Sequence, residues 1–252
     1  MNYSKNNNRQ LSVVILAAGK GTRMKSDLPK VLHEVGKIPM VAHTVRLAKS
    51  IGSKKTIVVI GHKYELVEQA LQNESVEFAY QLEQKGTGHA VEQCRKQLQN
   101  FSGDVLVLSG DVPLLSQQTI KNLIDLYYKT KATASLLSAD FDDPTGYGRI
   151  IRNSDGTLNR IVEHKDADET ELAVKEINAG IYIFDSQTLF RLISEINNEN
   201  VQQEYYLPDV LPLILSEKNT VSVDKTKYIL EIQGVNTEQQ LDKLNEEYAK
   251  LH

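Results

Sequence analysis

The chain has 252 residues, of which 40% are hydrophobic and 25% are charged, with a formal net charge of −4. This composition is ordinary for a soluble globular protein of one large α/β domain or two small ones, and it excludes a global basic field that would attract nucleic acid. The single cysteine, Cys94, excludes an internal disulfide and fits a reducing compartment.

The chain shows no signal for export or for membrane insertion. Residues 1–10 are polar and lack the apolar core of a signal peptide, so we expect a disordered lead-in there. No apolar run approaches the roughly 20 residues that a membrane-spanning helix requires. We therefore expect a cytoplasmic protein that binds neither membranes nor nucleic acid.

Strand-like and helix-like segments alternate through the first half of the chain. Aliphatic and β-branched runs predict buried strands at residues 13–16, 56–60, 76–80 and 104–109. Apolar residues at helical spacing predict helices at residues 41–51, 63–72, 87–98 and 116–127. This alternation implies a parallel sheet covered by helices on both faces, with ligands at the carboxyl ends of the strands.

The pattern becomes richer in strands from about residue 132. We expect strands at residues 132–139, 148–152, 158–162 and 175–184, a hairpin turn at 153–156, and a late strand that begins at Val221. Helices are expected at residues 186–196, 207–215 and 237–251. The last helix begins with a capping box, Thr237 to Gln240. Its predicted apolar stripe consists of Leu241, Leu244, Tyr248 and Leu251. Because no linker-like stretch separates the halves, we expect a single domain over residues 11–252.

The most specific stretch follows the first strand and reads LAAGKGTRM at residues 16–24, with Pro-Lys at 29–30. Gly19 and Gly21 allow backbone N–H groups to approach an anion closely. Arg23, Lys25 and Lys30 add positive charge where phosphate oxygens would lie. The stretch therefore predicts a phosphate-binding loop, although a bare Gly-x-Gly could equally be an ordinary tight turn.

Spacing excludes two better-known phosphate motifs. A P-loop requires Gly-Lys followed by Ser or Thr, whereas Gly21 is followed by Thr22. The dinucleotide fingerprint requires a third glycine where Met24 stands.

Two oxygen-bearing side chains are candidate ligands of Mg²⁺. Asp111 follows the strand at 104–109, and Asn236 precedes the last helix. Magnesium takes few carboxylates and retains waters and substrate phosphates, so one aspartate and one amide oxygen would suffice. The alternatives are a helix-capping or turn aspartate and an ordinary turn asparagine.

Four further groups of polar residues lie beside glycines or at strand ends. Gln81 and the loop at residues 84–89 suit recognition of an uncharged planar base, or they form a turn before a helix. Residues 143–149, 162–166 and 176–180 suit a hydroxyl-rich sugar. Within them Glu163 could be only a surface charge and Asn178 only a strand-edge residue. His89 and His164 are interpreted as structural, and no zinc or serine-hydrolase spacing is present.

Taken together, these segments resemble the uridylyltransferase domain of bacterial bifunctional N-acetylglucosamine-1-phosphate uridyltransferases. The matching motifs run in the same order from about residue 11 onward, and they are LAAGKGTRMKSDLPKVLH, QKGTGHA, GDVPLL, DDPTGYGRI, VEHKDA, EINAGIY, EYY and GVN.

The resemblance implies a Rossmann-like α/β nucleotidyltransferase fold with a mostly parallel sheet and a β-rich sugar-binding subregion. It implies synthesis of UDP-N-acetylglucosamine from UTP and N-acetylglucosamine 1-phosphate with Mg²⁺ as cofactor. A nucleotide-binding half would span about 11–131, a sugar-binding half about 132–236, and a closing helix 237–251.

The resemblance also implies roles for individual residues. Arg23 and Lys30 would be catalytic, and Asp111 and Asn236 would bind the metal. The implied nucleotide-binding residues are Leu16, Ala17, Ala18, Gly19, Lys30, Gln81, Gly86, Thr87, Ser109, Gly110 and Asp111. The implied sugar-binding residues are Gly148, Glu163, Asn178 and Asn236.

Three features depart from the family pattern. Ser109 stands where relatives often carry tyrosine, and Gln203 stands where glycine is usual. The sequence stops at His252, without the β-helix acetyltransferase domain that supplies the family's trimer contacts. We therefore expect no acetyl transfer and a monomer or weak dimer in place of a trimer.

Three other functions remain open on the sequence. The enzyme could use another sugar 1-phosphate, or the protein could be a non-catalytic sensor of sugar nucleotides. A nicotinamide dehydrogenase is disfavoured by Met24 and by the cationic loop.

Overall fold

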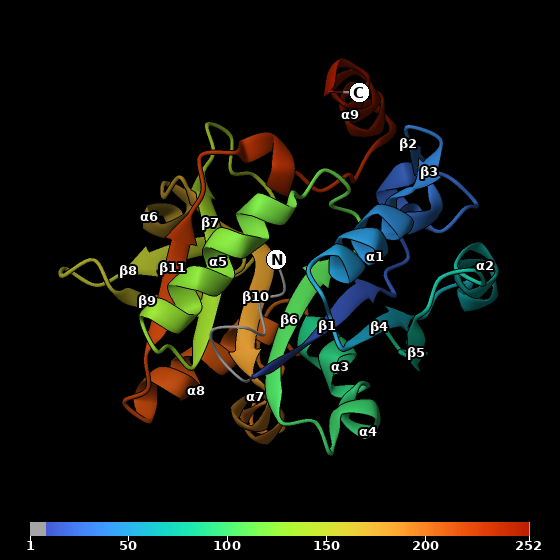
Figure 1. Cartoon of the computed structure of the whole chain (residues 1–252). Coiled ribbons are helices and arrows are strands. Elements are labelled where there is room, and N and C mark those ends of the chain that lie inside the picture. Colours follow the sequence, from blue (N-terminus) through green and yellow to red (C-terminus); the bar gives the residue numbers. More distant parts are fainter. Residues whose placement is uncertain (1–8, 252) are drawn as a thin grey trace.

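The structure is a computed structural model that describes residues 9–251 (Figure 1). The strands are β1 (Gln10–Ala17), β2 (Glu34–Val35), β3 (Ile38–Pro39), β4 (Lys55–Ile60), β5 (Glu77–Tyr80), β6 (Gly103–Ser109), β7 (Ala134–Asp140), β8 (Arg149–Arg152), β9 (Leu158–Val162), β10 (Glu176–Asp185) and β11 (Val221–Lys225). The α-helices are α1 (Met40–Ser50), α2 (Tyr64–Ala70), α3 (Thr87–Glu92), α4 (Arg95–Leu98), α5 (Gln117–Lys129), α6 (Glu169–Leu172), α7 (Ser186–Leu192), α8 (Val210–Ser216) and α9 (Glu238–Leu251). Short 3₁₀ turns cover Thr22–Met24, Lys30–Leu32, Leu207–Asp209 and Ile229–Ile232.

The main sheet has the strand order β11-β7-β10-β6-β1-β4-β5, and β8 and β9 extend from β10 as a hairpin. Strands β6, β1, β4 and β5 are parallel, whereas β10 runs antiparallel to both β6 and β7. The predicted mostly parallel sheet is therefore confirmed. Because β1 and β6 are parallel neighbours, the loops that follow them lie at the same edge of the sheet.

Helices cover both faces of the sheet, as predicted. Successive residues of a strand point to opposite faces, so Val13 and Ile15 of β1 pack with α1, α2 and α5, while Val14 packs with α3, α7 and α8. Figure 1 shows α1 and α5 in front of the sheet and α3 and α7 behind it.

Residues 87–98 form two helices, and the prediction of a single helix was wrong. After α3 the N–H groups of Gln93 and Cys94 bond to the carbonyls of Ala90 and Val91, three residues back, at 3.2 and 2.9 Å. This tighter turn bends the chain so that Cys94 and Leu98 both stay buried against the sheet. The buried packing predicted for Cys94 is confirmed, and burial raises the pKa of its thiol.

Two other predicted helices are shorter than expected. The segment predicted at 186–196 is helical only over α7, which ends at Leu192. The segment predicted at 207–215 begins as a 3₁₀ turn and becomes α-helical at Val210.

The closing helix α9 packs against a hairpin of β2 and β3 that the sequence did not predict. The side chain of Asn245 bridges the two elements, accepting from Gly36 N at 3.0 Å and donating to the carbonyl of Glu34 at 3.1 Å. Leu244 is buried, whereas Leu251 is 65% exposed. Leu251 is therefore not part of the buried stripe.

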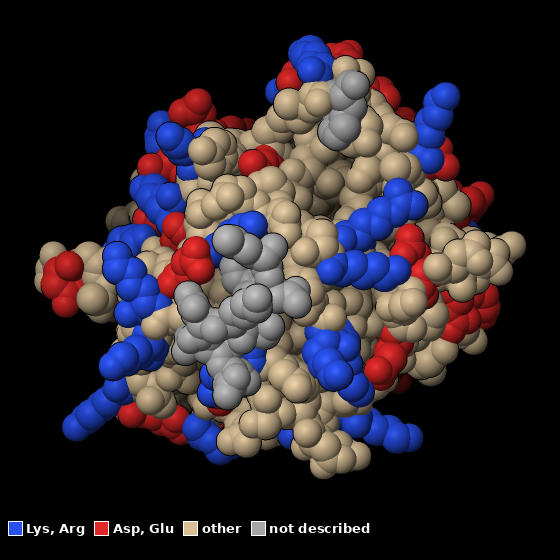
Figure 2. All heavy atoms as spheres, in the orientation of Figure 1, with Lys and Arg blue, Asp and Glu red and all other residues tan. Residues whose placement is uncertain are grey.

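The charged side chains are mixed on the surface that Figure 2 shows, where Lys and Arg alternate with Asp and Glu. Within residues 9–251, no helix combines the length and the apolar character needed to cross a membrane.

The start of the described chain is anchored by a buried carboxylate. Residues 1–8 of the expected lead-in lie outside the described residues, but Gln10 already belongs to β1 and Arg9 pairs with Asp104. Asp104 is fully buried and accepts the hydroxyls of Tyr127 and Tyr128 at 2.8 and 2.7 Å. These three partners stabilise a charge that would otherwise be costly to bury.

Replacing this carboxylate should destabilise the fold. We expect Asp104→Ala to lower the free energy of unfolding by about 2–4 kcal/mol, because it leaves two buried hydroxyls without an acceptor. Tyr128→Phe removes a single donor and should cost only about 1 kcal/mol. Urea denaturation followed by circular dichroism measures both. Equal effects of the two substitutions would contradict the assignment of Asp104 as the shared acceptor.

Candidate active site

Two pockets open where the loops after β1 and β6 meet. The first is lined by residues of the glycine loop, of the segment 81–90 and of the loop after β6. The second is lined by the loop after β6 and by residues around β8, β9 and β10. Both pockets share Leu16, Thr87, Ser109 and Asp111 as lining residues. The two cavities therefore adjoin at the end of β6.

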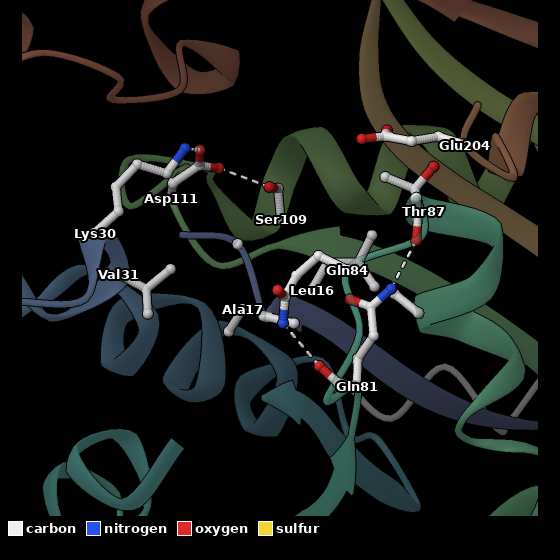
Figure 3. A pocket seen from close by; sticks show the side chains of 14 residues that line it. Leu16, Ala17, Lys30, Val31, Gln81, Gln84, Thr87, Ser109, Asp111 and Glu204 are labelled. Carbon is white, nitrogen blue, oxygen red and sulfur yellow. Dashed lines mark hydrogen bonds and ion pairs between the residues drawn. The ribbon is translucent and has the colours of Figure 1, made fainter. Parts of the chain in front are cut away.

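The predicted nucleotide-binding residues gather in the first pocket. Its lining includes Leu16, Ala17, Ala18, Gly19, Lys30, Gln81, Gly86, Thr87, Ser109 and Asp111. Figure 3 shows a charged end, where Lys30 and Asp111 point toward each other, and a glutamine end with Gln81, Gln84 and Thr87, beside which Glu204 lies. Gly110 lies behind the wall, where its N–H donates to the carbonyl of Leu16 at 2.9 Å.

The glutamine end is held in shape by its own side chains. The amide nitrogen of Gln81 donates to the carbonyl of Gly86 at 2.9 Å and lies 3.0 Å from His89 Nδ1. Gly86 has a φ of 103°, and a Cβ there would lie 2.5 Å from the carbonyl oxygen of Tyr205. Only glycine therefore fits at this position. The result is a fixed loop that presents backbone groups beside the pocket.

The charged end is formed by residues far apart in the sequence. The ammonium of Lys30 forms an ion pair with Asp111 Oδ2 and donates to Asn236 Oδ1 at 3.1 Å. Arg23 donates to the same Asn236 oxygen at 2.8 Å. The four predicted catalytic and metal-binding residues thus form one connected cluster, with Lys30 at its centre.

Local structure fixes each member of this cluster. Lys30 begins a 3₁₀ turn, and Gly21, with a φ of 62°, lies so close that a Cβ on it would be 2.5 Å from Lys30 Cβ. Asn236 is held by its N–H, which donates to Gln240 Oε1 at 2.7 Å, and the neighbouring Val235 N–H donates to the carbonyl of Asp111 at 3.1 Å. One half of the predicted capping box is present, because the Thr237 hydroxyl accepts from Gln240 N at 3.2 Å. The other half is shifted by one residue, because the Gln240 side chain accepts from Asn236 N and not from Thr237 N.

Asp111 is held as a carboxylate. Burial raises the pKa of Asp111, but the positive charge of Lys30 and hydrogen bonds from Lys30 and Ser109 outweigh burial, so the pKa lies below its ordinary value. The Ser109 hydroxyl donates to Asp111 Oδ1 at 2.6 Å. The serine that departs from the family pattern therefore orients the carboxylate.

The predicted sugar-binding residues gather in the second pocket, which is lined by Gly148, Glu163, Asn178 and Asn236. Asn178 lies where the pairing of β10 with β7 shifts register, and its amide donates to Tyr182 Oη at 2.6 Å. Gly180, with a φ of 70°, completes this bulge. Such bulges re-aim side chains beside binding sites.

Comparisons with known proteins show which family this chain belongs to. Residues 12–230 match the family described as nucleotidyl transferase. This chain belongs to the nucleotidyl transferase family. It is therefore an enzyme of that class by descent, and the resemblance drawn from its motifs is confirmed at the level of the family.

Curated relatives of this nucleotidyltransferase include the bifunctional protein GlmU of Bacillus cereus (strain AH187) and that of Bacillus thuringiensis (strain Al Hakam). Each is 50% identical over 223 residues, which is 88% of this chain and 48% of the relative. The chain thus spans about half the length of these relatives. A Bacillus anthracis crystal structure named "Putative Glucose-1-Phosphate Thymidylyltransferase" matches with a TM-score of 0.72 at 21% identity, covering 96% of both chains. That likeness shows the fold alone.

The oxygen donors suit magnesium. Among residues 9–251 no group of three or more His, Cys, Asp or Glu side chains is placed to hold a metal ion. Asp111 and Asn236 supply one carboxylate and one amide oxygen, both directed at the Lys30 ammonium. A hard cation that keeps waters and substrate phosphates as its other ligands fits this set.

Five further pocket residues received no individual role in the sequence analysis. They are Gln84 and Glu204 in the first pocket and Tyr147, Tyr182 and Gly180 in the second. Each lies inside a motif that the sequence analysis quoted, so the motifs indicated the segments but not these side chains. Glu204 comes from a segment distant in the sequence, and the fold brings it to the first pocket.

The second departure from the family pattern, Gln203, has a backbone explanation. Its φ is 54°, in the left-handed region that favours glycine. Asn200 stabilises this turn, with its carbonyl accepting from Gln203 N at 3.0 Å.

Other acidic side chains surround Glu163 of the sugar-side pocket. Burial, followed by the charges of Asp166, Asp209 and Glu204, raises the pKa of Glu163 to about 7. Burial and Asp166 raise the pKa of Asp209 to about 6. Near neutral pH a fraction of Glu163 is therefore protonated, and a protonated carboxyl group is able to donate a hydrogen bond.

This pKa shift predicts a pH dependence of stability. The unfolded chain releases the Glu163 proton near 4.5 and the folded protein near 7, so the free energy of unfolding should fall as pH rises through this window. We expect that the decrease in the free energy of unfolding over this window is smaller by about 2–3 kcal/mol in Glu163→Gln. Melting temperatures measured from pH 4 to 8 test this. Parallel curves for the two proteins would contradict the shift, and Asp209→Asn provides a matched comparison at lower pH.

Proposed function

We propose that this nucleotidyltransferase is a UDP-N-acetylglucosamine pyrophosphorylase. It would convert UTP and N-acetylglucosamine 1-phosphate to UDP-N-acetylglucosamine and pyrophosphate. The observation that carries the proposal is the pair of adjoining pockets, whose shared wall includes Asp111, with the Lys30 ammonium beside it. A nucleotide in the first pocket and a sugar phosphate in the second would bring their phosphates together at this wall.

The chemistry requires charge neutralisation more than proton transfer. An oxygen of the sugar 1-phosphate forms a bond to the α-phosphorus of UTP, and the bond from that phosphorus to the α–β bridging oxygen breaks. The electron pair leaves with pyrophosphate. Because the attacking oxygen is already anionic near neutral pH, alignment and electrostatic stabilisation supply most of the catalysis.

The residues of the cluster have distinct roles in this proposal. Asp111 and Asn236 would hold Mg²⁺, which when bound supplies positive charge to both phosphate groups. Lys30 and Arg23 would neutralise charge on the triphosphate as it develops on the leaving oxygens. Ser109 keeps Asp111 in place.

The walls of the two pockets would select the substrates. Gln81, Gly86 and Thr87 would recognise the uracil base, while residues Leu16 to Gly19 would contact the nucleotide. In the second pocket Gly148, Glu163 and Asn178 would hold the acetamido sugar. The 50% identity to GlmU proteins over 223 residues supports this pair of substrates.

A pyrophosphate-release assay with a panel of substrates tests the proposal. UTP and dTTP are each paired with N-acetylglucosamine 1-phosphate and glucose 1-phosphate. We expect the highest kcat/KM for UTP with N-acetylglucosamine 1-phosphate. Faster turnover with glucose 1-phosphate would favour another sugar, and tight binding without turnover would favour a sensor.

Substitutions at the cluster should abolish most of the activity without unfolding the protein. We expect Lys30→Ala and Asp111→Ala each to lower kcat by at least about 10²-fold, since each removes one electrostatic group. The surface variant Lys54→Gln serves as the control and should retain turnover. Chelation by EDTA should also stop turnover. Near-normal rates in either cluster variant, or activity that survives chelation, would refute the assigned roles.

A further inference from the structure

The two proposed metal ligands already hold a cation, the ammonium of Lys30. Its Nζ contacts Asp111 Oδ2 and lies 3.1 Å from Asn236 Oδ1. The other Asp111 oxygen accepts the Ser109 hydroxyl at 2.6 Å. The oxygens available for a metal ion are therefore the same two that bind Lys30.

This arrangement is well shielded from water. The side chains of Lys30 and Asp111 are only 17% and 14% exposed. Two opposite charges in such a place stabilise each other, and removing one partner leaves the other uncompensated. A divalent ion between the same oxygens would lie within a few ångströms of the ammonium, where like charges repel strongly.

The Lys30 side chain also borders a second site that its ammonium could occupy. Its backbone is fixed, because Lys30 O accepts from His33 N at 3.2 Å and Gly21 packs against Lys30 Cβ. Its side chain, however, also lines the nucleotide-side pocket. Phosphate oxygens bound in that pocket would offer the ammonium a new anionic partner in place of Asp111.

We propose that Lys30 is the resident cation of the metal subsite, and that a divalent ion enters only when Lys30 transfers to the phosphates of the nucleotide. The inference rests on the proposed function, in which Asp111 and Asn236 are the metal ligands. It makes metal and nucleotide binding mutually dependent, because each removes an obstacle to the other. The protein without nucleotide should bind divalent ions poorly.

Mn²⁺ binding to the full chain without substrates, measured by electron paramagnetic resonance, tests the exchange. We expect Lys30→Met to bind Mn²⁺ about tenfold or more tightly than the unaltered protein, within the usual range of coupling between sites. Lys30→Gln is the second variant, and thermal melts establish that each variant is folded. Unchanged or weaker Mn²⁺ binding by the folded Lys30 variants would overturn the proposal.

Two control variants separate exchange from general charge effects. Arg23→Gln removes a cation that contacts Asn236 but for which no bond to Asp111 is found in the described chain, and Lys25→Gln removes an exposed cation of the same loop. We expect each substitution to change the Mn²⁺ affinity by less than about threefold. The reason is that neither the Arg23 guanidinium nor the Lys25 ammonium occupies both ligand oxygens. Equally tighter Mn²⁺ binding in the variants at Lys30, Arg23 and Lys25 would overturn the exchange, because it would reflect only the general loss of positive charge.

A final variant distinguishes failure of this inference from failure of the proposed function. Adding Asp111→Asn to Lys30→Met should abolish the tight Mn²⁺ site. If Mn²⁺ stays bound, Asp111 is not a metal ligand, and both the metal assignment and the exchange fall. If the pyrophosphate assay fails while Lys30→Met alone tightens Mn²⁺ binding, the exchange stands and the assigned reaction falls.

Discussion

The meeting of Lys30, Asp111 and Asn236 is the contact on which the rest of the site depends. A carboxylate largely withdrawn from water is stable only when it has partners, and here the Lys30 ammonium joins it to the Asn236 oxygen, while Ser109 and Arg23 supply second donors. The three residues come from the turn after the glycine loop, the end of β6 and the approach to α9. Each of these segments is fixed by its own backbone bonds, so the cluster is assembled by the fold rather than by any local motif.

The topology explains why this cluster lies between two pockets. Parallel strands β1 and β6 deliver the glycine loop and Asp111 to one edge of the sheet. The antiparallel strand β10 then runs beside β6 and carries Asn178 and its bulge to the same region. A purely parallel sheet would place only strand ends at this edge, whereas the reversed strand adds the middle of β10. The second pocket exists because of that reversal.

Much of the fold could be predicted because it follows from local periodicity. The run at Val13 to Leu16 indicates a buried strand, and Asp111 directly after another strand indicates a ligand at its carboxyl end. The hairpin of β2 and β3 could not be predicted, since each strand has two residues and no period to detect. The same holds for pairings such as Lys30 with Asn236, which depend on packing across the whole chain. Leu251 shows the limit of periodicity, because it has the spacing of the stripe and yet remains 65% exposed.

The docking of α9 has a consequence for the newly made protein. Lys30 and Asn236 are separated by 206 positions, and Gln240 and Asn245 hold the turn at Asn236 and helix α9 in place. On the ribosome, strands β1 to β10 emerge from the exit tunnel before residue 236, so most of the sheet can form before Asn236 joins Lys30. In the proposed function, a nascent chain at this stage would have most of its core in place while lacking one of its two metal ligands.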